Sequence, residues 1–155
     1  MKLQGIIGFT TDNKQFKIVN SNYQELFKVR GNEPSIKFRY LQVRMSTKYT
    51  NMLYDLYPEF SNIFDEYENI LYAIAMEIHK AYIERFIKKK YIIVSREEFV
   101  VMMECHKWHI TNRTENRISL KKVINMMNKQ SPNNLNHMIR HYKSNKLNTK
   151  KTENK

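Results

Sequence analysis

The sequence predicts a mainly α-helical protein that begins with a short β-hairpin. Three Gly and three Pro in 155 residues leave few turn-forming positions, and a hydrophobic fraction of 41% is sufficient for a core. Apolar residues recur at helical spacing over long stretches, whereas β-prone runs are confined to the first twenty residues. We therefore expect a β-hairpin at 1–20, an α-helical bundle domain at 21–142 and a disordered basic tail at 143–155.

The hairpin is predicted from two β-prone runs with turn formers between them. Residues 5–9 read Gly-Ile-Ile-Gly-Phe and residues 15–19 read Gln-Phe-Lys-Ile-Val, while the polar residues 10–14 separate them. A lone hairpin is barely stable in water, so these strands should pair with something else. The partner expected at this edge is another chain, a second copy, or a missing N-terminal half.

The helical domain is predicted to contain one long amphipathic helix from about residue 60 to residue 90. Its N-terminal half carries acidic residues and its C-terminal end carries basic ones, a polarity that complements the helix dipole. The apolar residues of its stripe are Phe60, Ile63, Phe64, Tyr67, Leu71, Ile74, Ile78, Tyr82 and Phe86. This stripe predicts the core of a helical bundle.

Shorter helices are predicted on both sides of the long one. Before it, Asn20 or Ser21 can cap a short helix that ends at Gly31. After it, Ser95 and Glu98 form a capping-box pattern that starts a helix near residue 95. Two more follow near 119–129 and 132–142, the second with Pro132 in its first turn, where proline is tolerated.

The charge balance favours a polyanionic partner. The net charge is +12, from 27 basic and 15 acidic residues, and nucleic acid is the usual partner of such a protein. The alternative is a solubility surplus with a basic tail, because residues 143–155 alone hold five Lys and one Glu. We expect RNA as the partner. The alternative is a helical interaction protein whose charge has no role in its function.

The best nucleic-acid candidate is the basic segment between residues 28 and 48. Its bases can bind phosphates, and Phe38 or Tyr40 could stack on nucleobases. An equally weighted alternative is that Phe38 and Leu41 face the core and the charges are merely solvated. The predicted RNA-binding residues are Arg30, Lys37, Arg39 and Arg44.

Two short motifs near the N-terminus carry a resemblance to a known family. Gln4-Gly5-Ile6-Ile7 and Phe16-Lys17-Ile18-Val19, with Asn20 and Tyr23 beyond, resemble the last two motifs of the nucleotide-binding core in phage-type and viral ATP-dependent RNA ligases. These ligases belong to the covalent nucleotidyltransferase superfamily. The resemblance implies that Lys17 contacts nucleotide phosphates, that Gln4 and Gly5 lie at the nucleotide site, and that the helical domain binds RNA. The alternative for Lys17 is an ordinary exposed lysine in a hairpin.

The sequence departs from the family pattern at positions that matter for catalysis. Gln4 stands where the family has Glu, and an amide cannot supply the anionic oxygen that Mg²⁺ prefers. Val19 replaces the second lysine of the phosphate clamp. The nucleophilic Lys-x-Asp-Gly motif occurs nowhere in the sequence, so no covalent lysyl-nucleotide can form on this chain.

The sequence therefore predicts the C-terminal part of an RNA ligase-like protein with no catalytic residue of its own. We expect it to be inactive alone and to contribute to ATP-dependent RNA end joining only when an N-terminal half supplies the nucleophile. ATP and Mg²⁺ would be cofactors in that case and not otherwise. The alternative function is that of a non-enzymatic, basic helical protein that binds nucleic acid.

Metal and membrane functions are not expected. Cys105, His106 and His109 lie close together on one predicted helix, but no second Cys/His pair at ligand spacing accompanies them. A single cysteine also excludes an internal disulfide. The start lacks the apolar run of a signal peptide, and no window approaches the roughly 18 apolar residues that span a bilayer. We expect a cytoplasmic protein, in the host cytoplasm if it is viral.

Overall fold

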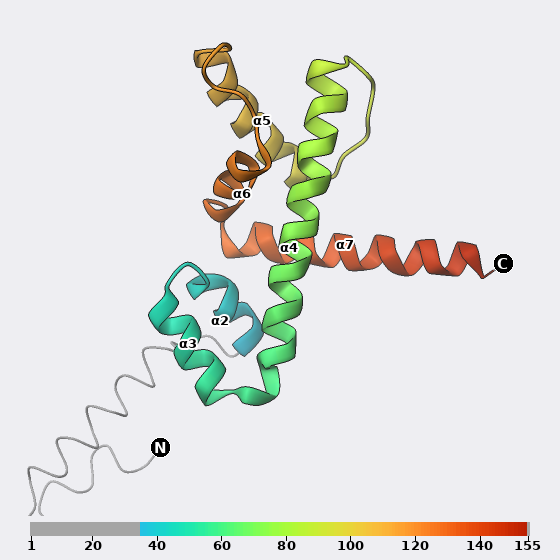
Figure 1. Cartoon of the computed structure of the whole chain (residues 1–155). Coiled ribbons are helices and arrows are strands. Elements are labelled where there is room, and N and C mark those ends of the chain that lie inside the picture. The colour runs from blue at the N-terminus through green and yellow to red at the C-terminus, as the bar shows by residue number, and fades with distance from the viewer. Residues whose placement is uncertain (1–34, 155) are drawn as a thin grey trace, which may run out of the picture. The chain divides into compact units, whose positions relative to one another are not determined.

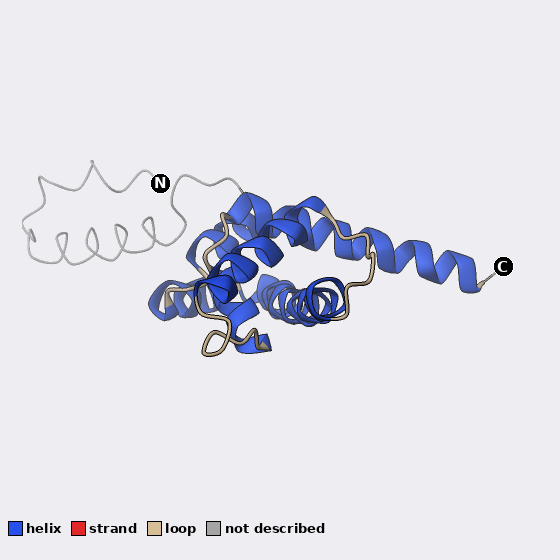
Figure 2. Ribbon diagram, turned by 90° about the horizontal axis from the view of Figure 1, so that it is seen from above, coloured by secondary structure: helices blue, strands red, loops and turns tan. Residues whose placement is uncertain are grey.

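The computed structural model describes residues 35–154, and within them the chain forms helices joined by loops (Figures 1 and 2). The chain divides into two compact units, 1–61 and 62–155, a boundary that the sequence did not indicate. In order, the elements are α2 (Ile36–Val43), α3 (Thr47–Leu56), the 3₁₀ turn η2 (Pro58–Phe60), α4 (Ser61–Tyr82), the π-helical turn η3 (Ile83–Ile87), α5 (Arg96–Thr111), α6 (Leu120–Asn128) and α7 (Pro132–Glu153).

The expected fold class is confirmed as mainly α but is wrong in its β component. No strand and no sheet occur in residues 35–154, and the hairpin expected at 1–20 lies outside the described residues. The described part of the chain offers no sheet that such a hairpin could extend. The short helix expected to end at Gly31 also lies outside the described residues.

In the first unit, α2 and α3 are short helices that each begin with a serine N-cap. The side chains of Ser35 and Ser46 accept hydrogen bonds from backbone amides three residues later, which satisfies donors that the helices leave unpaired. Tyr40 is buried and packs edge-on against Tyr54, with 6.2 Å between the ring centroids. The buried apolar residues of these helices are Ile36, Tyr40, Leu41, Val43 and Leu53.

In the second unit, α4 is the long amphipathic helix that the apolar stripe predicts. Its buried residues are Phe64, Tyr67, Ile70, Leu71, Ile74, Ala75, Ile78, Ala81 and Tyr82. The regular helix ends at Tyr82, earlier than expected, and continues as the π-helical turn η3. Lys89 then takes a left-handed backbone conformation with φ of 58°, which ends the helical path.

Helices α5 and α7 each contact α4, and α6 packs against α5. The Ser95 side chain accepts a hydrogen bond from the Glu98 amide at 3.3 Å, so the predicted cap at the start of α5 is confirmed. Figure 1 shows α7 crossing α4 at a steep angle. Helices α6 and α7 both bury apolar residues. The buried residues of α5, α6 and α7 are Val101, Met102, Cys105, Val123, Met126, Met127, Leu135, Met138 and Ile139.

Helix α7 differs from the expectation at its end. It continues through Glu153, whereas the sequence predicted a helix ending near residue 142 and a disordered tail. Every side chain in residues 143–153 is exposed. Helix persists because adding residues to an existing helix avoids the cost of nucleation, and because no Gly or Pro interrupts 133–153.

Candidate nucleic-acid interface

One basic feature of the second unit is the exposed second half of α7. We call residues 143–153 the α7 extension. Its cationic side chains are Lys143, Lys146, Lys150 and Lys151, and its single acidic residue is Glu153. Because residues three, four, seven and eight apart share a helix face, the four lysines lie on one side of the helix, together with the exposed Leu147.

The base of the α7 extension is fixed to α4. Lys143 Nζ lies 3.3 Å from Glu66 Oε1 and 5.7 Å from the centroid of the Tyr67 ring. Further along, Lys146 Nζ lies over the ring of Tyr142 on its own helix. Lys150 and Lys151 have no carboxylate partner in the part of the chain that the structure describes. Among the four lysines, Lys143 is thus the one paired with a carboxylate of the described residues.

An open groove of about 300 Å³ lies beside the base of the α7 extension and is acidic. It is lined by Asn62, Asp65, Glu66, Asn69, Ile70 and Tyr142. Its two carboxylates repel phosphate, and Lys143 meets one of them. Contact with a polyanion is thus favoured on the lysines beyond Lys143 and disfavoured in the groove.

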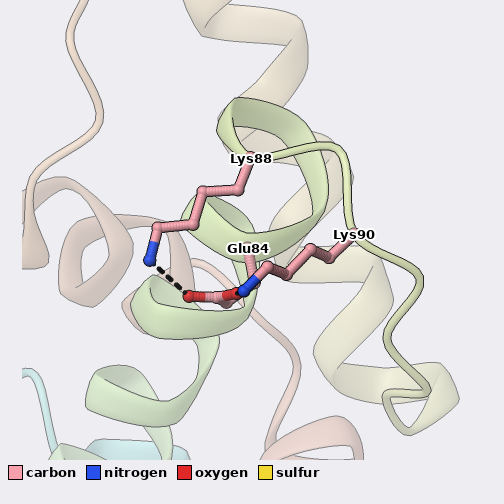
Figure 3. A network of polar contacts seen from close by, with 3 residues as sticks. All are labelled: Glu84, Lys88 and Lys90. Atoms are coloured by element: carbon pink, nitrogen blue, oxygen red, sulfur yellow. Dashed lines mark hydrogen bonds and ion pairs between the residues drawn. The ribbon is translucent and has the colours of Figure 1, made fainter.

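A second basic feature follows the π-helical turn at the end of α4. We call residues 88–90 the lysine loop, and Figure 3 shows its contacts. Lys88 Nζ lies 2.9 Å from Glu84 Oε1, and Lys90 Nζ lies 3.4 Å from Glu84 Oε2. The hydrogen bond from Lys88, assisted by Lys90, holds the pKa of Glu84 below its ordinary value. Lys89 has no carboxylate partner among residues 35–154.

An aromatic and histidine cluster packs between α4 with its π-helical turn and α5. The His106 ring stacks on Phe86 with 4.1 Å between centroids, and its Nδ1 lies 3.2 Å from Tyr82 Oη. His109 Nδ1 donates to the carbonyl oxygen of Asn116 at 2.6 Å. Burial lowers the pKa of His106, and neighbouring positive charges lower it further. An imidazole with such a pKa is neutral at pH 7, so we assign His106 to packing and not to phosphate binding.

Cys105, His106 and His109 on α5 do not form a metal-binding arrangement. Across residues 35–154, no group of three or more His, Cys, Asp or Glu side chains is placed to hold a metal ion. Cys105 is fully buried in α5, and burial raises the pKa of its thiol to about 11. A buried thiol with a raised pKa is a packing group rather than a nucleophile.

The predicted RNA-binding residues of the first unit do not form one row. Lys37 is exposed, whereas Arg39 Nη1 donates to Gln42 Oε1 at 3.2 Å and Arg44 Nη1 lies 3.6 Å from Met45 Sδ. Lys37 and Arg44 are seven residues apart and share a face, but Arg39 lies about 200° around the helix from Lys37. Arg30 lies outside the described residues, as do the predicted nucleotide-binding residues Gln4, Gly5 and Lys17.

The predicted stacking rings of this segment differ in exposure. Tyr40 is 4% exposed and packs against Tyr54, so its ring is not available to a base. Leu41 is also buried, which favours the alternative in which this side of the segment faces a core. Phe38 is half-buried. The lysines of the α7 extension are not among the predicted RNA-binding residues, because the sequence places them in a disordered tail.

Comparison with known proteins gives two viral relatives. No family model matches the chain, and no solved structure matches it. The chain is 28% identical to an immediate-early protein ICP-46 homolog of Invertebrate iridescent virus 6 over 115 residues, which are 72% of this chain and 25% of that protein. It is 29% identical to the protein of the same name from Invertebrate iridescent virus 3 over 142 residues, which are 88% of this chain and 32% of that protein.

The similarity extends beyond a single compact unit. Both matches cover more of the chain than residues 62–155 contain, so each includes residues of the first unit as well. The chain spans a quarter of one relative and about a third of the other. No helix within residues 35–154 combines the length and the apolar character that crossing a bilayer requires.

Proposed function

We propose that the chain is a basic helical protein that binds RNA without catalysing a reaction on it. The observation that carries the proposal is the α7 extension, a helix that buries no side chain and carries four lysines against one glutamate. No side chain of the α7 extension is used in packing, so its lysines are available to a partner in solution. Polyanionic phosphate is the partner that this charge favours.

Phosphate contacts supply affinity without reading sequence. Each lysine that neutralises a phosphate releases condensed counterions, so binding weakens linearly on a logarithmic salt scale. The contacts alone do not separate RNA from DNA, and RNA is named because the N-terminal motifs resemble those of RNA ligases. We propose the host cytoplasm as the place of action, because the similar proteins come from viruses.

The proposal is tested by fluorescence anisotropy with a labelled 20-nucleotide RNA across a salt series. We expect the logarithm of the association constant to fall linearly with the logarithm of salt concentration, with a slope of about −0.7 for each phosphate contacted. The same titration with DNA of equal length shows whether the sugar matters. Absence of RNA binding at low salt, or affinity that salt does not change, would contradict the proposal.

A second proposal, supported by the motifs around Gln4, Gly5 and Lys17, is a role in ATP-dependent RNA end joining. It requires a partner that carries the nucleophilic lysine, together with ATP and Mg²⁺. We expect no covalent label when the chain alone is incubated with α-labelled ATP and Mg²⁺. Ligation should appear only after a polypeptide with Lys-x-Asp-Gly is added, and labelling of the isolated chain would show that our account of the nucleophile is wrong.

A further inference from the structure

The segment that follows the lysine loop, residues 91–94, is a loop that presents apolar side chains to solvent. Tyr91 is 88% exposed and Ile93 is 84% exposed, whereas Ile92 and Val94 between and after them are half-buried. This alternation is expected of an extended chain with one side packed and the other free. Tyr91 and Ile93 are therefore exposed on one side of the segment, and Ile92 and Val94 pack on the other side.

The start of this segment is fixed by Glu84. Its backbone carbonyl accepts a hydrogen bond from the Lys90 amide at 2.9 Å, and its carboxylate binds the side chains of Lys88 and Lys90. Figure 3 shows both lysines converging on this one carboxylate from opposite sides. Tyr91 thus follows directly after a backbone that is held at both ends of the lysine loop.

Lys88 and Lys90 are paired with Glu84, whereas Lys89 between them is not. Lys89 is exposed, has a left-handed backbone and has no carboxylate partner in residues 35–154. Two residues of chain span at most about 7 Å, so the Lys89 ammonium and the Tyr91 ring can contact the same nucleotide. A free cation next to an exposed aromatic ring is the pairing that binds unpaired nucleotides.

We propose that Tyr91 is a stacking platform for an unpaired base of single-stranded RNA and that Lys89 binds the adjoining phosphate. This inference rests on the proposed RNA binding and names the form of RNA. Bases in a duplex are already stacked on their neighbours and cannot accept the ring. A bilayer surface is the competing occupant, but one ring and one aliphatic side chain give little insertion area, and stable anchoring takes more than one signal.

The experiment compares three variants of the full chain, Tyr91→Ala, Tyr91→Phe and Ile93→Ala. Anisotropy is measured with labelled single-stranded oligouridylate and with a labelled RNA duplex of equal length. Binding to vesicles of phosphatidylserine and phosphatidylcholine is measured by co-sedimentation of the protein. We expect Tyr91→Ala to weaken single-strand binding by about 5- to 150-fold, the range that loss of one stacked base produces. Tyr91→Phe retains the ring and should bind like the wild type.

The matched control is Ile93→Ala, which removes a side chain of nearly equal exposure without a ring. We expect it to change single-strand binding by less than about twofold, and Tyr91→Ala to leave duplex binding unchanged. If the wild type binds single strands and Tyr91→Ala binds them equally well, the platform is refuted while the proposed function stands. If the wild type binds no RNA, both are refuted, and vesicle binding that Tyr91→Ala abolishes would assign the segment to lipid instead.

Discussion

Alanine at Ile78 is expected to lower the free energy of unfolding by about 2 to 5 kcal/mol, the range measured for large-to-small substitutions in protein cores. Ile78 lies on the buried face of α4 and is 1% exposed. The substitution removes three buried side-chain carbons and their packing contacts. It leaves a cavity that the surrounding helices fill only in part by relaxing toward it. Urea unfolding followed by far-ultraviolet circular dichroism measures the change.

The matched control is the same substitution at Ile110, which is 46% exposed on α5. We expect a change within about 0.5 kcal/mol there, because little apolar area is returned to water. If Ile78→Ala does not fold at all, Ile78→Val still gives a measurable loss of about 0.5 to 1.5 kcal/mol. Equal losses at positions 78 and 110 would contradict the assignment of this face of α4 to the core.

The long helix could be predicted because several independent signals agree in it. Its apolar residues recur at helical spacing, its charges complement the dipole, and no Gly or Pro interrupts 61–87. Ser95 and Glu98 predicted the start of α5 for the same kind of reason, since a capping pattern directly precedes an apolar face. Such elements are fixed by local chemistry that a single sequence contains.

The α7 extension could not be assigned correctly from composition. Few apolar residues and many lysines are the usual signature of disorder, because such a segment cannot bury enough surface to order itself. The earlier part of α7, with Leu135, Met138 and Ile139 buried, provides a preformed helix onto which later residues add at low cost. The relevant signal was the absence of a stop residue after Pro132.

The contacts of Glu84 depend on the π-helical turn η3 and on the left-handed Lys89, which a periodic sequence pattern does not predict. The pair Glu84 and Lys88 has the spacing of neighbours on a helix and could have been predicted. The pair Glu84 and Lys90 is six residues apart and meets only because the π-helical turn and the left-handed Lys89 fold the chain back. For this reason the exposure of Tyr91 also lay beyond sequence analysis.

Replacing Lys146, Lys150 and Lys151 with Gln is expected to weaken RNA binding by about 100-fold at 0.1 M salt. Each lost phosphate contact to a single strand reduces the slope of the logarithm of the association constant against the logarithm of salt concentration by about 0.7, so three lost contacts reduce it by about 2. If the wild type and the variant bind equally at 1 M salt, their association constants then differ by about 100-fold at 0.1 M, one logarithmic unit lower. Gln is a good helix former, so the α7 extension should remain helical while losing its charge. Anisotropy across a salt series measures both the affinity and the slope.

The control removes the same charge elsewhere, by replacing Lys80, Lys121 and Lys129, which are exposed on or beside α4 and α6, with Gln. Lysines that bind no phosphate act on the RNA only through a field that 0.1 M salt screens with a Debye length of about 10 Å, so affinity should fall far less and the slope should stay near that of the wild type. Equal weakening by the two triple variants would mean that net charge, and not the α7 extension, drives binding. A selective effect would instead place the RNA on the exposed helix, because only contact at specific phosphates changes the number of counterions released.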